Sequence, residues 1–170
     1  MCQANVAIAA MKFLGEESIL HLPKVGFLCS QRCPSHLILK SYDWVIRQRE
    51  EGICVVSGFD SKIEWDVLGF LLKGNQPIIM VLARNMKRRF PVEVRKAIDK
   101  KRLLIISPFS EKVKEKSKIS CYKRNETILK IVDEIVIGYA HPRGQLEKLL
   151  KINKHKGVSY LSDIDRDCSL

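Results

Sequence analysis

The chain has 170 residues, 46% of them hydrophobic, and its 30 Lys and Arg outnumber its 19 Asp and Glu. This length suits a single domain with a sizeable core, and six Cys lying mostly within or beside apolar segments exclude a secreted disulfide framework. The apolar run at residues 6–11 is too short for a signal peptide, and no later run is long enough to span a membrane. We therefore expect a soluble, cytoplasmic protein without a membrane partner.

Strands and helices are expected to alternate along the chain. Apolar runs without polar alternation predict strands at residues 24–29, 53–57, 77–82, 103–107, 134–139 and 158–161. Apolar residues at helical spacing predict helices at residues 34–50, 61–72, 91–100, 124–132 and 144–152. A short helix is also expected around Asn5 to Leu14, and residues 110–123 are expected to be a loop or a mobile hairpin.

Strands that are buried on both faces and separated by helices run parallel, which predicts an α/β fold with a doubly wound, mostly parallel sheet. We expect a lead-in at residues 1–23, a single domain at residues 24–161 and a polar tail at residues 162–170. In such a sheet, ligands lie beyond the carboxyl ends of the strands. The segments expected there are residues 30–33, 57–62, 83–89, 107–109 and 140–144.

The stretch from Ile53 to Leu72 predicts an anion site, because a strand leads directly into a helix. Ser61 and Glu64 have the spacing of a capping box, so the helix is expected to begin at Asp60 or Ser61. A small Ser57-Gly58 pair in front of a helix N-terminus suits a phosphate. The alternative is an ordinary turn in which the glycine only satisfies a backbone angle.

The positive charge is concentrated between Arg84 and Arg124, where 15 Lys and Arg stand against four Asp and Glu. Clustered cations predict a polyanion partner, and the alternative is a solvated, Lys-rich surface. Ser30, Gln31 and Arg32 follow the first strand of the expected sheet at the usual place of a phosphate-binding turn. No G-x-G-x-x-G fingerprint is present, which argues against NAD.

The sequence predicts neither a metal nor a cofactor. Cys29, Cys33 and His36 lack a fourth ligand at zinc-binding spacing. No Ser-His-acid or Cys-His pair can be placed, and His141 beside Pro142 is expected to be a loop residue. We therefore expect no catalytic residues.

The order of four short motifs resembles the Rossmann-like domain of the DNA-processing protein A family (DprA, also called Smf), within the wider group that includes the lonely-guy phosphoribohydrolases. Residues 29–32 (CSQR) are similar to the family's G-S-R turn, and residues 57–64 (SGFDSKIE) to its S-G-x-A-x-G-I-D turn. Residues 124–128 (RNETI) are similar to R-N-R-x-I, and residues 143–146 loosely match S-G-[ST]-x-x-T-A. Cys29, Lys62 and Glu126 depart from these patterns, so we expect the phosphate contacts to differ in detail.

The resemblance implies binding of single-stranded DNA, which family members pass to the RecA recombinase during natural transformation. Family members often carry extra domains, for which we expect no room in these 170 residues. A recombinase partner and a homodimer stay open. The residues expected to bind phosphate or nucleic acid are Ser30, Gln31, Arg32, Ser57, Gly58, Lys62, Arg84, Lys123, Arg124, Asn125, Arg143 and Gly144.

Two alternatives remain. One is a sensor module that binds a small phosphorylated nucleotide without chemistry. The other is a nucleotide phosphoribohydrolase, whose P-G-G-x-G-T-x-x-E motif begins at Pro142 but has Leu150 in place of its carboxylate.

Overall fold

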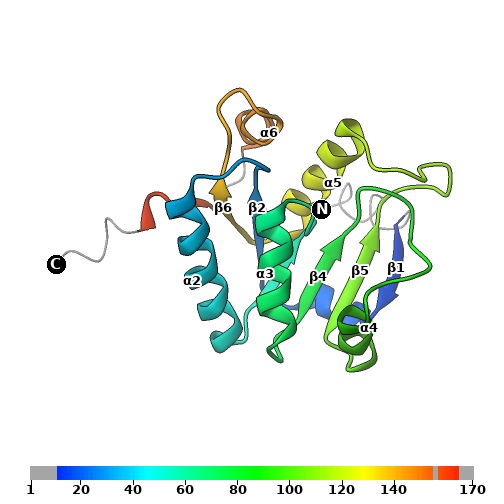
Figure 1. Cartoon of the computed structure of the whole chain (residues 1–170). Coiled ribbons are helices and arrows are strands. Elements are labelled where there is room, and N and C mark those ends of the chain that lie inside the picture. Colours follow the sequence, from blue (N-terminus) through cyan, green and yellow to red (C-terminus); the bar gives the residue numbers. More distant parts are fainter. Residues whose placement is uncertain (1–10, 155–156, 165–170) are drawn as a thin grey trace.

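The computed structural model of the chain describes residues 11–154 and 157–164 (Figure 1). The strands are β1 (Lys12–Gly15), β2 (Lys24–Cys29), β3 (Cys54–Ser57), β4 (Ile78–Val81), β5 (Leu103–Ser107), β6 (Glu134–Tyr139) and β7 (Val158–Tyr160). The helices are a 3-10 helix η1 (Glu17–His21) and the α-helices α2 (Ser35–Glu51), α3 (Lys62–Leu72), α4 (Val92–Asp99), α5 (Lys118–Ile131) and α6 (Gln145–Ile152). No helix in the described part of the chain is both long and apolar enough to cross a membrane.

The described strands form one seven-stranded sheet in the order β1-β5-β4-β3-β2-β6-β7. All neighbours are parallel except β1, which pairs antiparallel with β5. The chain runs outward from β2 through β3 and β4 to β5, and then crosses over to place β6 on the other side of β2. This reversal is a topological switch point, the place where open α/β sheets bind ligands.

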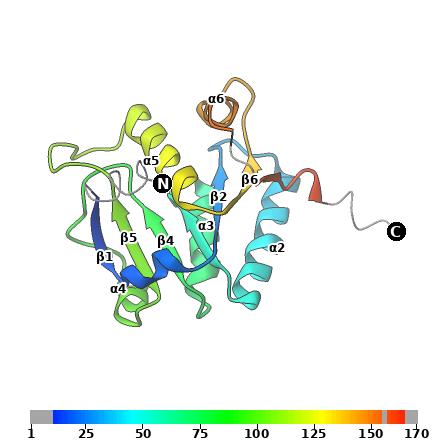
Figure 2. The same ribbon diagram turned by 180° about the vertical axis from the view of Figure 1, so that it is seen from behind.

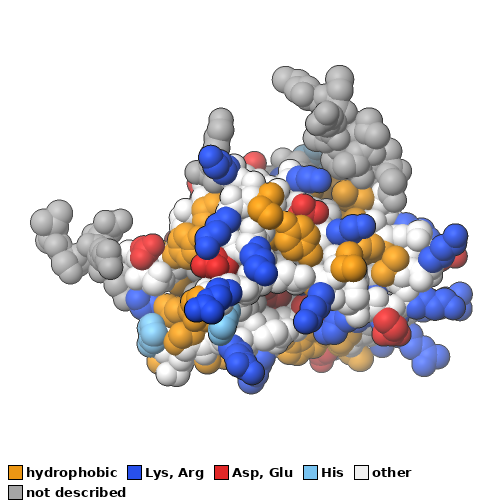
Figure 3. Space-filling model, turned by 90° about the horizontal axis from the view of Figure 1, so that it is seen from above, with side chains coloured by type: hydrophobic (Ala, Val, Ile, Leu, Met, Phe, Trp, Pro, Cys, Tyr) orange, Lys and Arg blue, Asp and Glu red, His pale blue; other side chains and the backbone are white. Residues whose placement is uncertain are grey.

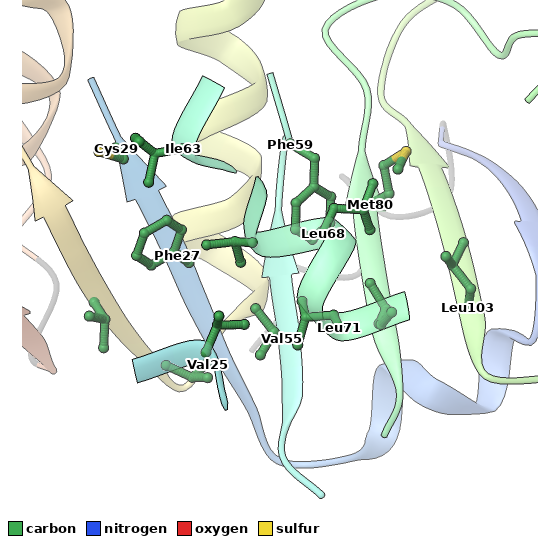
Figure 4. Packing of buried hydrophobic residues seen from close by; sticks show 14 of the residues in the cluster. Val25, Phe27, Cys29, Val55, Phe59, Ile63, Leu68, Leu71, Met80 and Leu103 are labelled. Atoms are coloured by element: carbon green, nitrogen blue, oxygen red, sulfur yellow. The ribbon is translucent and has the colours of Figure 1, made fainter. Parts of the chain in front are cut away.

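Helices cover both faces of the sheet, as Figures 1 and 2 show from opposite sides. Helices α2, α3 and α4 pack on one face over a core that includes Phe27, Leu68 and Leu71 (Figure 4). Helices α5 and α6 pack on the other face, where Ile128 and Leu149 are fully buried. The central strands are β-branched and apolar with both faces buried, for example IIMV in β4, and this composition suits the interior of a parallel sheet. The three layers confirm the predicted fold class.

The expected helix around Asn5 to Leu14 is wrong over residues 11–14, because strand β1 begins at Lys12 and Met11 is not helical. Residues 5–10 of that helix lie outside the described residues. Phe13 packs against the core of the α5 side, and the strand pairs with β5. Gly15 then turns the chain with φ +113°, at a point where a Cβ would overlap the carbonyl oxygen of Leu103. Tertiary pairing therefore overrides the weak helical pattern.

Helix α5 begins six residues earlier than expected, so the prediction of a loop over residues 110–123 is wrong from Lys118 onward. Ser117 and Ser120 cap the helix reciprocally, since the Ser117 hydroxyl accepts from Ser120 N–H and the Ser120 hydroxyl accepts from Ser117 N–H. This cap moves the start of α5 to the edge of the sheet where the other βα loops lie.

Candidate functional site

A cavity of about 460 Å³ opens outside the carboxyl ends of β2 and β3, at the switch point of the sheet. Its walls come from the turns after β2 and β3, from the start of α5 and from the start of α6. Figure 3 looks down on this edge and shows many more Lys and Arg than Asp and Glu side chains. Segments far apart in the sequence therefore meet around one hollow on a basic face.

Of the described helices, α3, α5 and α6 begin at the wall of this cavity. At the start of α3 and of α5, a capping box accepts hydrogen bonds from two backbone N–H groups: those of Ser61 and Glu64 in α3, and those of Ser117 and Ser120 in α5. Helix α6 follows Gly144 and has no side-chain cap among the described residues. The first N–H groups of α6 are thus the ones most available to an anion, and the helix dipole places partial positive charge there.

Glu64 joins the turn after β3 to the end of β2. The residue is 3% exposed, and its carboxylate accepts hydrogen bonds from the backbone N–H groups of Cys29 (3.0 Å), Asp60 (2.9 Å) and Ser61 (3.3 Å). Burial raises the pKa of the Glu64 carboxyl, while the guanidinium of Arg124 and these N–H groups act in the opposite direction. Because its oxygens are occupied, Glu64 shapes the wall and is poorly placed for proton transfer.

Arg124 supplies a buried positive charge at the cavity floor. Its side chain is 5% exposed, its Nε donates to Asn125 Oδ1 at 2.7 Å, and its Nη2 lies 3.9 Å from Asp60 Oδ2. The guanidinium lies over the backbone of Gly58, where a Cβ would overlap it. The cation is therefore held in one place before any ligand arrives.

Asp60 links the turn after β3 to the loop before α5. Its carboxylate accepts from Lys116 Nζ at 2.6 Å and from Cys121 Sγ at 3.6 Å. Burial acts to raise the pKa of the Asp60 carboxyl, but Lys116 and Arg124 hold it below its usual value. The aspartate is thus ionised at neutral pH and positions Lys116 at the rim.

No family model matches this chain, and no curated protein sequence matches it. Solved structures do match. DprA from Streptococcus pneumoniae superposes with a TM-score of 0.65 at 18% identity, over 85% of this chain and 55% of that one. DprA from Helicobacter pylori, in a structure that describes its single-stranded DNA binding mode, superposes with a TM-score of 0.70 at 17% identity, over 91% of this chain and 75% of that one.

The fold is DprA-like. The chain spans about half of the length of the S. pneumoniae protein, so the similarity concerns the sheet and its helices. Within this DprA-like fold, the cavity described above lies at the edge where α/β folds place ligands.

The structure brings together part of the set expected from the sequence. Ser30, Gln31, Arg124 and Asn125 line the cavity of the DprA-like fold. The Ser30 hydroxyl accepts from His141 N–H at 3.0 Å and so joins the loops after β2 and β6. Gly144 is the N-cap of α6, and the next residue, Gln145, lines the cavity.

The other expected residues do not line this cavity. Ser57 is fully buried, and its hydroxyl accepts from Phe59 N–H at 3.3 Å. Lys62 is exposed and pairs with Asp66, and Arg84 lines a neighbouring hollow. Of the remaining four, Gly58 lies in the turn against the guanidinium of Arg124. The other three, Arg32, Lys123 and Arg143, are exposed on the surface of the DprA-like fold.

Ten cavity residues of the DprA-like fold were absent from the expected set: Cys29, Asp60, Ser61, Glu64, Lys116, Ser117, Lys118, Cys121, Gln145 and Leu146. The capping-box spacing identified Glu64 as a structural residue but gave no sign that it faces a cavity. Lys116 and Lys118 belong to an alternating charged run that is typical of solvated loops. Among residues 11–154 and 157–164, no cluster of His, Cys, Asp and Glu is arranged to hold a metal ion.

Proposed function

We propose that the chain binds single-stranded DNA, with one phosphate of the strand held in the cavity at the switch point. The observation that carries this proposal is the convergence of Arg124, Lys116 and Lys118 on the uncapped start of α6. A phosphate offers several acceptor oxygens, which match the guanidinium, the ammonium groups and the free helix N–H groups. In this proposal the anion lies against α6 and Arg124, rather than directly on Ser57 and Gly58.

The remaining expected residues have supporting places in the proposal. Ser30, Gln31 and Asn125 contribute polar groups from the walls, and Ser57 and Gly58 form the turn on which Arg124 lies. Further cations extend the binding surface on the proposed path of the strand; they are the exposed Arg32, Lys62, Lys123 and Arg143 and the half-buried Arg84. Such cations give affinity that does not depend on base sequence.

The shared fold with the H. pylori protein supports a single-stranded DNA ligand. No Phe, Tyr or Trp is among the described residues that line the cavity, so stacking on bases has no platform there. The proposal therefore predicts recognition of the sugar-phosphate backbone with little base preference. It includes a cytoplasmic role in DNA processing or natural transformation, in keeping with the resemblance to the DprA family.

A cavity of about 460 Å³ is also within the usual size range for a small-molecule ligand, which keeps the sensor of a phosphorylated nucleotide as a second candidate. Fluorescence anisotropy separates the two candidates. Labelled single strands, labelled duplexes and a panel of nucleotides are compared at two salt concentrations. Salt-sensitive binding of single strands supports the proposal, whereas salt-insensitive binding of a mononucleotide without polymer binding would overturn it.

A further inference from the structure

A second hollow lies beside the cavity, between the loop after β4 and the loop after β5. Residues 84–89, together with Lys114 and Glu115, line it, and its volume is about 580 Å³. Backbone contacts hold the two loops together, since Asn85 N–H donates to the carbonyl of Val113 at 2.8 Å. This hollow shares none of its described lining residues with the cavity at the switch point.

The second hollow carries an excess of positive charge. Arg84, Lys87, Arg88, Arg89 and Lys114 line it, with Glu115 as the carboxylate among its lining residues. The Glu115 side chain is 86% exposed and lies 3.9 Å from Arg84 Nη1. The Nε of Arg84 is buried, and no described residue accepts a hydrogen bond from it. A buried donor without a protein acceptor is satisfied by water or by an anion, and the surrounding cations favour an anion here.

One loop connects the two sites. Lys114 lines the second hollow and Lys116 lines the cavity, and two residues of chain span at most about 7 Å. Lys114, Glu115 and Lys116 are all exposed, so along this loop no apolar residue separates the two sites. Glu115 lies between these two lysines in the chain and pairs with Arg84.

We propose that the second hollow is a further phosphate subsite for the same single strand of DNA. In this proposal Glu115 pairs with Arg84 until a DNA phosphate displaces it. This inference rests on the proposed function. A DNA strand long enough to reach both sites binds with higher affinity, because once one phosphate is bound the second contact forms at a high effective concentration. A short oligonucleotide occupies the cavity alone. The hollow thus selects a polymer over a small nucleotide.

The test uses the full chain and labelled oligodeoxythymidylates of about 4 and about 20 nucleotides, measured by fluorescence anisotropy. A longer strand offers more binding registers, so the ratio of the two affinities is compared between variants and is not interpreted alone. The double variant Arg88→Gln/Lys114→Gln should lower the affinity of the long strand about fivefold or more and reduce its log-log salt slope by about 1.4, because two phosphate contacts are lost. The affinity of the short strand should stay unchanged.

Glu115→Gln should raise the affinity of the long strand about two- to fivefold, again without effect on the short one, since the competing carboxylate is removed. Glu51→Gln, at the end of α2 on the opposite edge of the sheet, is the matched control and should change neither affinity. Equal changes in affinity for the long and the short oligonucleotide would overturn the proposed subsite. So would unchanged affinities in both the double variant and Glu115→Gln. If neither strand binds the wild-type chain, the proposed function itself fails.

Discussion

The guanidinium of Arg124 lies against the backbone of Gly58, in the space that a side chain at that position would need. An added Cβ would overlap Nη1 and Cζ and would lie 2.7 Å from Nε. This packing joins the turn after β3 to the middle of α5 and keeps the cation almost completely buried. It gives a physical reason for glycine at a turn whose backbone angle does not demand one.

Gly58→Ala should therefore displace Arg124 and weaken single-strand binding. Crowding of a buried group should also lower the free energy of unfolding by about 1–3 kcal/mol. Both quantities are measurable, by anisotropy and by denaturant titration. Gly69→Ala is the matched control: a Cβ there meets no atom within 4 Å, and the residue is inside α3, so stability should rise by up to about 1 kcal/mol with binding unchanged. Wild-type binding by Gly58→Ala would contradict this account.

Lys118→Gln should weaken single-strand binding and lower the log-log salt slope by about 0.7, the value of one phosphate contact on a single strand. Lys118 is exposed and lines the cavity, so the substitution removes charge with little effect on packing. Lys100→Gln, next to the start of β5 on the far edge, should leave the slope unchanged. If both variants lower the slope equally, binding is spread over the whole surface and the cavity has no special role.

Lys116→Met should raise the pKa of the Asp60 carboxyl, because burial then acts with only Arg124 and Cys121 to oppose it. A carboxyl-detected NMR titration measures this directly, and Lys112→Met, in the same loop, should leave the value unchanged. Since the pKa of Asp60 is lower in the folded state, its contribution to stability is present above about pH 4 and is lost as the pH falls through the folded value. The stability difference between wild type and Lys116→Met should shrink over that acidic range. An unshifted Asp60 titration in Lys116→Met would refute the pairing.

No release of base from nucleoside 5′-monophosphates is expected. Leu150 packs against the core, and Glu147 accepts from Arg143 N–H at 2.9 Å and pairs with Lys151, outside the cavity. Product analysis by chromatography checks this. Turnover above a buffer blank that Glu147→Gln abolishes would show that this carboxylate moves into the site.

The parallel sheet was predictable because its strands are continuous apolar runs between helices with clear signals, such as the capping box of Ser61 and Glu64. Strand β1 was not predictable, because Lys12–Gly15 is exposed along much of its length and becomes a strand only by pairing with β5. The start of α5 was missed because Ser117 and Ser120 form a capping box without the usual Glu or Gln.

Part of the candidate site followed from the order of the loops, which placed Ser30, Gln31, Arg124 and Asn125 near one another. The contact of Lys116 with Asp60 could not be predicted, because it depends on how the loop after β5 folds back across the sheet edge. The burial of Arg124 against the turn after β3 likewise follows from tertiary packing that local sequence does not encode.

The position of β2 in the middle of the sheet has a consequence during synthesis on the ribosome. Gly26 pairs with Val56 on one side and with Ile135 on the other, so one edge of β2 stays open until residues 134–139 have emerged. An open apolar edge is a template for wrong pairing and a target for chaperones. A nascent chain that stops before Glu134 would lack both the strand that closes this edge and the helix α6 that completes the cavity wall.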